Sequence, residues 1–109
     1  MTSYILKGKI PIICDNIYEW AEWFGTADRV VVQSTVHGIE ISTVFLGINH
    51  RFGGNGDPLL FETMVFGGDL DETTLRYSTW EEAEKGHRDI LDKVKRTEKV
   101  LLRKMDIGG

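Results

Sequence analysis

The residues of this sequence that could carry chemistry are three histidines, a few arginines and one acid set in an apolar run. The acid is Glu62, within the segment LLFETMVF, where an ionised carboxylate is costly unless a partner neutralises it. The partner could be Arg51 or Arg76 in an ion pair, or the ring of His50 or His87. Glu62 is therefore half of a structural salt bridge, a polar anchor for a ligand, or a general base.

A second candidate is the glycine-rich loop HRFGGNG that precedes this segment. Glycines let backbone N–H groups approach an anion closely, and the guanidinium of Arg51 can bind phosphate or carboxylate through a pair of hydrogen bonds. The loop matches neither the G-x-x-x-x-G-K-S/T pattern nor a G-x-G-x-x-G that opens a helix. A hairpin loop without a ligand is the alternative.

The third candidate is His87, which lies in the apolar stripe of the C-terminal segment. It is either a partly buried histidine hydrogen-bonded to backbone or to an acid, or a ring at the edge of a pocket that neighbouring Gly86 opens. The other histidines, His37 and His50, are far from it in sequence, and no H-x-x-x-H, cysteine cluster or G-x-S-x-G pattern occurs. We therefore expect no metal, no cofactor and no serine triad.

The elements that must position these residues follow from hydrophobic periodicity within one domain, residues 1–109. Residues 4–10 predict a short edge strand, and residues 59–66 predict a central strand because apolar groups occupy both of its faces. Residues 73–77 predict a short edge strand after the glycine pair at 67 and 68. The sequence predicts an α+β fold: an antiparallel sheet of four to five strands with two helices, the longer one C-terminal.

A hairpin is predicted over residues 29–47, with His37 and Gly38 as its two-residue turn. The register that follows pairs Val36 with Ile39, and it places β-branched and aromatic residues on one face and polar ones on the other. Its remaining pairs are Ser34 with Ile41, Val32 with Thr43, and Val30 with Phe45.

The two helices are predicted from apolar stripes and caps. The first covers residues 15–25, with Asp15 or Asn16 as N-cap, Gly25 as its stop and Trp23 off the centre of its stripe. The second begins after Thr79, which forms a capping box with Glu82, and reaches the high nineties or beyond. The apolar stripe of the first helix comprises Ile17, Trp20, Ala21 and Phe24. The stripe of the second comprises Trp80, Ala83, His87, Ile90, Leu91, Val94 and Leu101.

The charge pattern limits the classes of partner that the protein is expected to bind. A net charge of −4 and a pI near 5.3 argue against non-specific nucleic-acid binding. The C-terminal helix is locally basic, and the interleaved acids favour an ion-paired, solvated face over a phosphate-binding stripe. The single Cys14 forms no intrachain disulfide and suits a reducing cytosol, and no run of about 18 apolar residues suggests a membrane span. The basic residues of this helix are Arg88, Lys93, Lys95, Arg96, Lys99, Arg103 and Lys104.

Two segments resemble a family of small uncharacterised bacteriophage and prophage proteins: STVFLGINHRFGGNGDPLLFETMVFGG and RYSTWEEAEKGH. The resemblance covers about half of the chain. Asn49 stands where the family usually has Asp, and Asp57 precedes Pro58 where a second proline is common. If the acid at position 49 were essential, its replacement by Asn would put that chemistry in doubt.

The resemblance implies a phage accessory protein, of a kind that often counters host defences in the cytoplasm of the infected bacterium. From it we expect a non-enzymatic homo-oligomer that binds and sequesters a small nucleotide-like ligand, with no membrane role. Two alternatives stay open: an inhibitor that docks surface acids such as Glu19, Glu22, Asp69 and Asp71 onto a host effector, and a small hydrolase with Glu62 or His50 as its base. The expected ligand-binding residues, all in the shared segments, are His50, Arg51, Glu62, Thr63, Arg76, Tyr77, Trp80 and His87.

Overall fold

The computed structural model describes residues 2–108, and the side chains of residues 2–100. It has the predicted α+β architecture, with a four-stranded antiparallel sheet in the order β3-β4-β5-β6 and a separate two-stranded hairpin, β1-β2. The molecule is elongated, 60 × 31 × 19 Å along its principal axes. The elements are β1 (Tyr4–Lys7), β2 (Ile10–Ile13), α1 (Ile17–Thr26), β3 (Val30–Val36), β4 (Ile39–Phe45), β5 (Phe61–Phe66), β6 (Thr74–Tyr77) and α2 (Trp80–Gly108).

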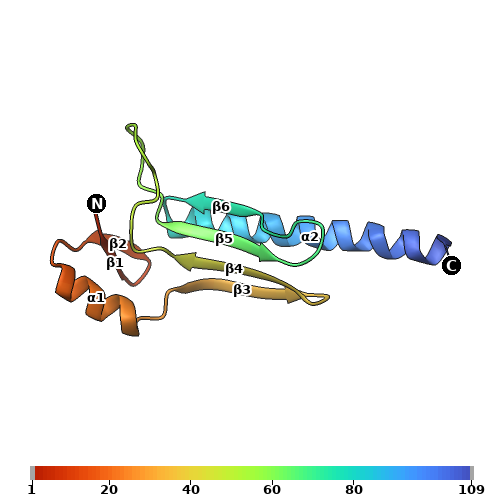
Figure 1. Ribbon diagram of the computed structural model, residues 1–109, viewed down its shortest axis with the longest axis horizontal. Helices are drawn as coiled ribbons and strands as arrows, with labels where there is room; N and C mark the ends of the chain where they lie inside the picture. Colours follow the sequence, from red (N-terminus) through yellow and green to blue (C-terminus); the bar gives the residue numbers. More distant parts are fainter. Residues whose placement is uncertain (1, 109) are drawn as a thin grey trace.

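Helix α2 lies along one face of the four-stranded sheet and continues past its end, whereas α1 and the β1-β2 hairpin lie at the opposite end (Figure 1). The helix starts where predicted, because the hydroxyl of Thr79 accepts a hydrogen bond from the backbone N–H of Glu82 at 3.1 Å. Its apolar stripe is confirmed at Ala83, Ile90 and Val94, which are buried. The predicted stripe residue Leu101 lies outside the described side chains.

The central hairpin follows the predicted register up to one point. His37 and Gly38 both have positive φ, 49° and 79°, as a two-residue turn of this hand requires. Pairing runs as expected from Val36 with Ile39 to Val32 with Thr43. A bulge then shifts the register, so Val30 pairs with Val44, and the predicted pairing with Phe45 is wrong.

The N-terminal segment differs from its prediction. Residues 4–10 do not form one edge strand of the main sheet; the chain turns at Gly8, and β1 pairs with β2 in register from Tyr4 with Ile13. This hairpin contacts α1, forms a bridge from Ser3 to Ile48, and packs Tyr4 and Leu6 against the aromatic end of the main core. The turn at Gly8 and Lys9 was missed because it is not one of the Asn-Gly or Asp-Gly pairs that mark two-residue hairpin turns most strongly.

Helix α1 packs through its aromatic residues rather than through the whole predicted stripe. Asn16 is the N-cap, with its side chain accepting from the N–H groups of Tyr18 and Glu19. Ile17 is 58% exposed, so its predicted place in the buried stripe is wrong, while Trp23 packs edge-on against Phe45 at 5.8 Å. The helix therefore contacts the fold through Trp20, Trp23 and Phe24, all partly buried, while Ala21 is exposed like Ile17, and it continues past the predicted stop at Gly25.

The aromatic residues of α1 contact the loop that follows β4. The indole N–H of Trp20 donates to the carbonyls of Tyr4 and Gly47, at 3.0 and 3.2 Å. Gly47 has a φ of 78°, and a side chain there would meet the ring of Phe24 at 3.0 Å. Glycine is therefore required at this position both by backbone conformation and by the close approach of the helix.

Candidate functional site

The sheet separates the expected site residues onto its two faces. Glu62 and Arg76 pair across β5 and β6 on the face away from α2, whereas Thr63 and Tyr77, one position further along each strand, face the helix. Glu62 therefore lies on the outer face of the sheet, although its neighbours on that face of the strand are apolar. The buried residues of β5 are Phe61, Thr63 and Val65.

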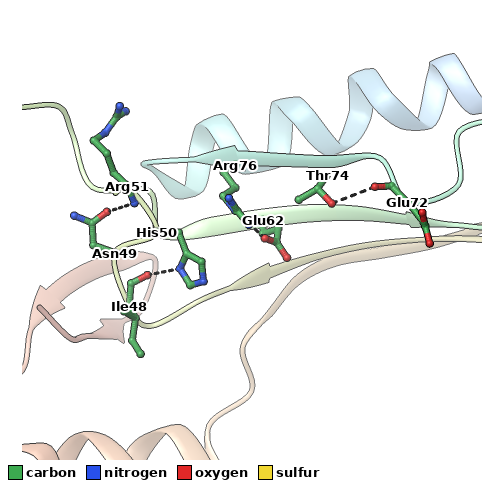
Figure 2. Close-up of polar contacts among 8 residues, drawn as sticks. All are labelled: Ile48, Asn49, His50, Arg51, Glu62, Glu72, Thr74 and Arg76. Carbon is green, nitrogen blue, oxygen red and sulfur yellow. Dashed lines mark hydrogen bonds and ion pairs between the residues drawn. The ribbon is translucent and has the colours of Figure 1, made fainter. Parts of the chain in front are cut away.

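Glu62 forms an ion pair with Arg76. The Nε of Arg76 lies 2.9 Å from Oε2 of Glu62, and the Glu62 side chain is 14% exposed (Figure 2). Arg51 takes no part in this pair, because its Nε donates to the carbonyl of Asp57 and Figure 2 shows its side chain directed away from the sheet. The pair satisfies the carboxylate on the sheet surface, where an ion pair contributes up to about 1 kcal/mol.

His87 is 1% exposed and lies between the sheet and α2. Its Nδ1 is 2.7 Å from the hydroxyl of Thr43, and its Nε2 is 2.9 Å from the hydroxyl of Ser34. The hydroxyl of Thr43 also bonds that of Thr63. Burial lowers the pKa of His87, because a charged ring would lose its hydration there. The first interpretation of His87 holds in that the ring is buried and hydrogen-bonded, but its partners are hydroxyl groups and not backbone or an acid.

This polar row crosses the core between two apolar clusters. One cluster comprises Ile39, Ile41, Val65, Ile90 and Val94. The other comprises Phe45, Leu60, Phe61 and Ala83. The polar residues occupy the intervening positions on each element, so a shift of α2 by one turn would leave their hydrogen-bonding groups unpaired. The row therefore fixes the position of the helix on the sheet.

The sequence carries a signal for this network in the hydroxyl residues on the core face of the hairpin. Ser34 and Thr43 occupy the inward-facing positions of the predicted hairpin, among β-branched and aromatic residues. Hydroxyls on a core face require hydrogen-bond partners. His87, on the apolar stripe of the covering helix, is the partner that such residues need.

Tyr77 packs its ring directly onto α2 at Gly86. A Cβ at position 86 would lie 2.2 Å from the ring. Burial raises the pKa of Tyr77, with the nearby Thr63 hydroxyl partly opposing it, although the phenol makes no hydrogen bond among the described residues. Trp80 lies edge-on to Phe61 at 6.2 Å, and its indole N–H is likewise buried without a partner in the described part of the chain.

The glycine-rich loop is held by its own side chains. Arg51 donates from Nε to the carbonyl of Asp57 at 2.8 Å and lies against Gly56. Oδ1 of Asn49 accepts from the N–H groups of Arg51 and Leu59, each at 2.9 Å, and His50 bonds through Nδ1 to the carbonyl of Ile48 (Figure 2). A carboxylate at position 49 could accept the same bonds, so the structural role suits Asp and Asn alike.

The clearest concentration of charge lies elsewhere, at the β3-β4 turn. A hollow of about 300 Å³ is lined by His37, Lys95, Arg96 and Lys99, and we call it the basic hollow. None of these cations forms an ion pair with a described side chain. Among the described side chains of α2, the only ion pair is Lys85 with Asp89, and the cations Lys93, Lys95, Arg96 and Lys99 are exposed, so the face is solvated as expected but carries few ion pairs.

A second groove, of about 310 Å³, runs between the edge strand β6 and α2. Its apolar residues come from both elements, and Asp89 and Lys93 lie on its rim. Tyr77 is the one expected ligand-binding residue that borders it. We call it the β6 groove; it is lined by Leu75, Tyr77, Gly86, Asp89, Ile90 and Lys93.

The surface acids of the rival interpretation do not form one face. Glu19 and Glu22 lie on α1, at one end of the sheet, and Asp69 and Asp71 follow β5 at the other end (Figure 1).

Among the side chains of residues 2–100, no cluster of histidine, cysteine and acidic groups could hold a metal ion. None of the described helices combines the length and the hydropathy needed to cross a bilayer. Comparison of the chain with protein-family models, with curated proteins and with solved structures gives no match.

Proposed function

We propose that this protein is a non-enzymatic accessory protein of phage origin that sequesters a small nucleotide-like anion in the basic hollow, as a homo-oligomer in the host cytoplasm. The observation that supports it is the hollow itself. It gathers three cations and a histidine in a chain whose net charge is −4, and none of the three cations is neutralised by a described acid.

The chemistry of the lining residues suits a phosphate-bearing ligand. Arg96 offers a planar guanidinium that binds phosphate oxygens in pairs, while Lys95 and Lys99 supply compact positive charges on the same helix. His37 faces them from a turn whose two residues are fixed at positive φ. The volume of about 300 Å³ is at the lower end of the range for small-molecule sites.

This assignment differs from the eight residues that the sequence suggested. Glu62 and Arg76 satisfy one another, and His87 is enclosed by hydroxyls. Arg51 is bonded within its own loop. Among the described residues, the hollow is where three cations without an ion pair lie together and can meet a ligand.

The proposal is tested by titrating the purified protein with inorganic phosphate, cyclic nucleotides and ADP-ribose derivatives in a calorimeter. We expect binding that weakens as salt is added. Lys95→Glu and Lys99→Glu each weaken it by about tenfold or more, as expected when a charge-assisted contact becomes repulsive. Arg88→Glu, the same charge change two turns earlier on α2, is the matched control. No heat with any ligand rejects the proposal, and equal loss in the control shows a long-range charge effect without a defined site.

A second candidate, docking onto a host effector protein, is favoured by the outer face of the four-stranded sheet. No described element covers this face, and Val44, Met64 and Phe66 lie on it beside the Glu62–Arg76 pair. A complex with one host protein, abolished by Phe66→Glu while phosphate binding persists, would support this candidate.

A further inference from the structure

Strand β6 is an edge of the main sheet, with β5 on one side and no described strand on the other. The carbonyls of Thr73 and Tyr77 accept from Val65 and Leu60, so alternate residues of this segment face the neighbouring strand. By the alternation of an antiparallel ladder, Thr74 and Arg76 direct their N–H and C=O groups outward. Such an edge is a template for a further strand unless charge or a covering element blocks it.

The β6 groove lies beside this edge and is apolar where the helix and the strand meet. Leu75 is 40% exposed, with Tyr77 and Ile90 next to it in the lining. Its rim carries one acid and one base, Asp89 and Lys93, one helical turn apart. Lys93 forms no ion pair with a described side chain, whereas Asp89 pairs with Lys85 at 3.0 Å on the exposed side of the helix.

From these features we propose that a second copy of this chain docks on the β6 groove, with the two β6 strands antiparallel about a two-fold axis through Leu75. The inference names the surface for the homo-oligomer of the proposed function, and it rests on that part of the proposal alone. The resulting sheet continues across both copies, and the two α2 helices lie antiparallel on the same side of it.

Charge selects this arrangement. With Leu75 opposite its own copy, Thr74 of each chain is opposite Arg76 of the other, and their outward backbone groups are paired reciprocally. A register shifted by one residue along each strand would place the two Arg76 side chains opposite each other, where like charges destabilise the pair.

The charged residues of α2 that line the β6 groove are also complementary between the two copies under this axis. Antiparallel α2 helices whose midpoint lies between Asp89 and Lys93 bring Asp89 of each copy toward Lys93 of the other, so that Asp89 meets a second cation besides its own Lys85. The contact occurs twice in the dimer because the axis repeats it. Such a self-complementary interface requires an acid and a base within the same surface patch. Asp89 and Lys93, one helical turn apart, meet this requirement.

The test measures the dissociation constant of the dimer by sedimentation equilibrium, with thermal unfolding as a check that each variant is folded. The wild-type chain is expected to be dimeric. Asp89→Lys and Lys93→Asp each oppose like charges at two symmetry-related places, so each raises the dissociation constant by about a hundredfold or more. Leu75→Arg does the same by placing two cations on the axis.

The decisive experiment mixes the two charge variants. An Asp89→Lys chain and a Lys93→Asp chain restore opposite charges at both contacts, so the mixture is expected to form a heterodimer although each chain alone is monomeric. Val30→Arg, on the opposite edge strand, is the control for adding a cation to an exposed apolar position, and it should leave the dimer intact.

A wild-type chain that stays monomeric at millimolar concentration overturns the proposal, as does a dimer that Leu75→Arg leaves unchanged or a mixture that fails to pair. These outcomes are separable from the fate of the proposed ligand site. Monomeric Leu75→Arg should still bind phosphate at the basic hollow if that site exists, and the lysine variants of the hollow should still dimerise.

Discussion

Gly86 provides the sharpest test of the packing between α2 and the sheet. Helix propensity alone predicts that Gly86→Ala stabilises the protein by about 1 kcal/mol, because glycine in a helix interior has more backbone freedom to lose than alanine. The structure predicts the opposite sign. A Cβ at position 86 would lie 2.2 Å from the ring of Tyr77, roughly 1.5 Å inside the normal separation of carbon atoms.

The magnitude follows from the two opposing terms. Neither the helix backbone nor the half-buried ring of Tyr77 can move away freely, so the overpacking cost lies near the upper part of its usual range, about 3 kcal/mol. Subtracting the gain in propensity leaves a net destabilisation of about 2 kcal/mol. For a domain of this size that lowers Tm by about 10 °C.

The matched control is Gly25→Ala in α1, where a Cβ would meet nothing within 4 Å and the backbone is already helical. This change should stabilise the protein by about 0.5–1 kcal/mol. Urea unfolding of both variants gives the two free energies. A Gly86→Ala variant as stable as the wild type, or more so, would refute the packing of Tyr77 on α2. Tyr77→Leu should remove most of the penalty, which a double-mutant cycle measures.

Three further outcomes are expected. The pKa of His87 is lowered in the folded chain, so the unfolded chain binds more protons below about pH 6.5, and stability should fall from there toward the lower folded pKa by up to about 1.4 kcal/mol per pH unit. Urea unfolding at several pH values should show this dependence, and His87→Gln should abolish it; an unchanged dependence would show that another group titrates. Gly47→Ala should destabilise by about 1–3 kcal/mol, because it adds left-handed backbone strain and a contact with Phe24; a loss below about 0.5 kcal/mol in thermal unfolding would contradict this. Arg76→Ala should lower the free energy of unfolding by no more than about 1 kcal/mol, and by less in high salt, because the ion pair lies at the sheet surface. A larger loss that salt does not reduce would mean that Glu62 is desolvated.

The features that could be predicted from sequence depend on contacts close along the chain. The turn at His37 and Gly38 sets the register of the β3-β4 hairpin, and Thr79 sets the start of α2. The central place of β5 followed from apolar residues on both of its faces. Where the prediction was wrong within the same elements, a single local irregularity was responsible, as with the bulge that moves Val30 by one partner.

The candidate site could be predicted only in part, because it depends on which face of the sheet the helix covers. Period-2 alternation shows that Glu62 and Met64 share a face and that Thr63 belongs to the other, but it does not assign the covering helix to either. Ionisable residues in apolar strands drew attention to Glu62, whereas the basic hollow unites His37 with lysines almost sixty residues later. No spacing rule along the chain connects residues that far apart.

By itself, the sequence determined the fold class, the main hairpin with its turn, the central strand and the capped C-terminal helix, because periodicity and capping act within a few residues. Only the tertiary structure decided that Arg76 is the partner of Glu62, that hydroxyls from two strands enclose His87, and that the cations of α2 gather beside the β3-β4 turn. The reason is that these contacts depend on how the helix lies across the sheet. That placement is set by the packing of two apolar clusters and a polar row drawn from distant segments.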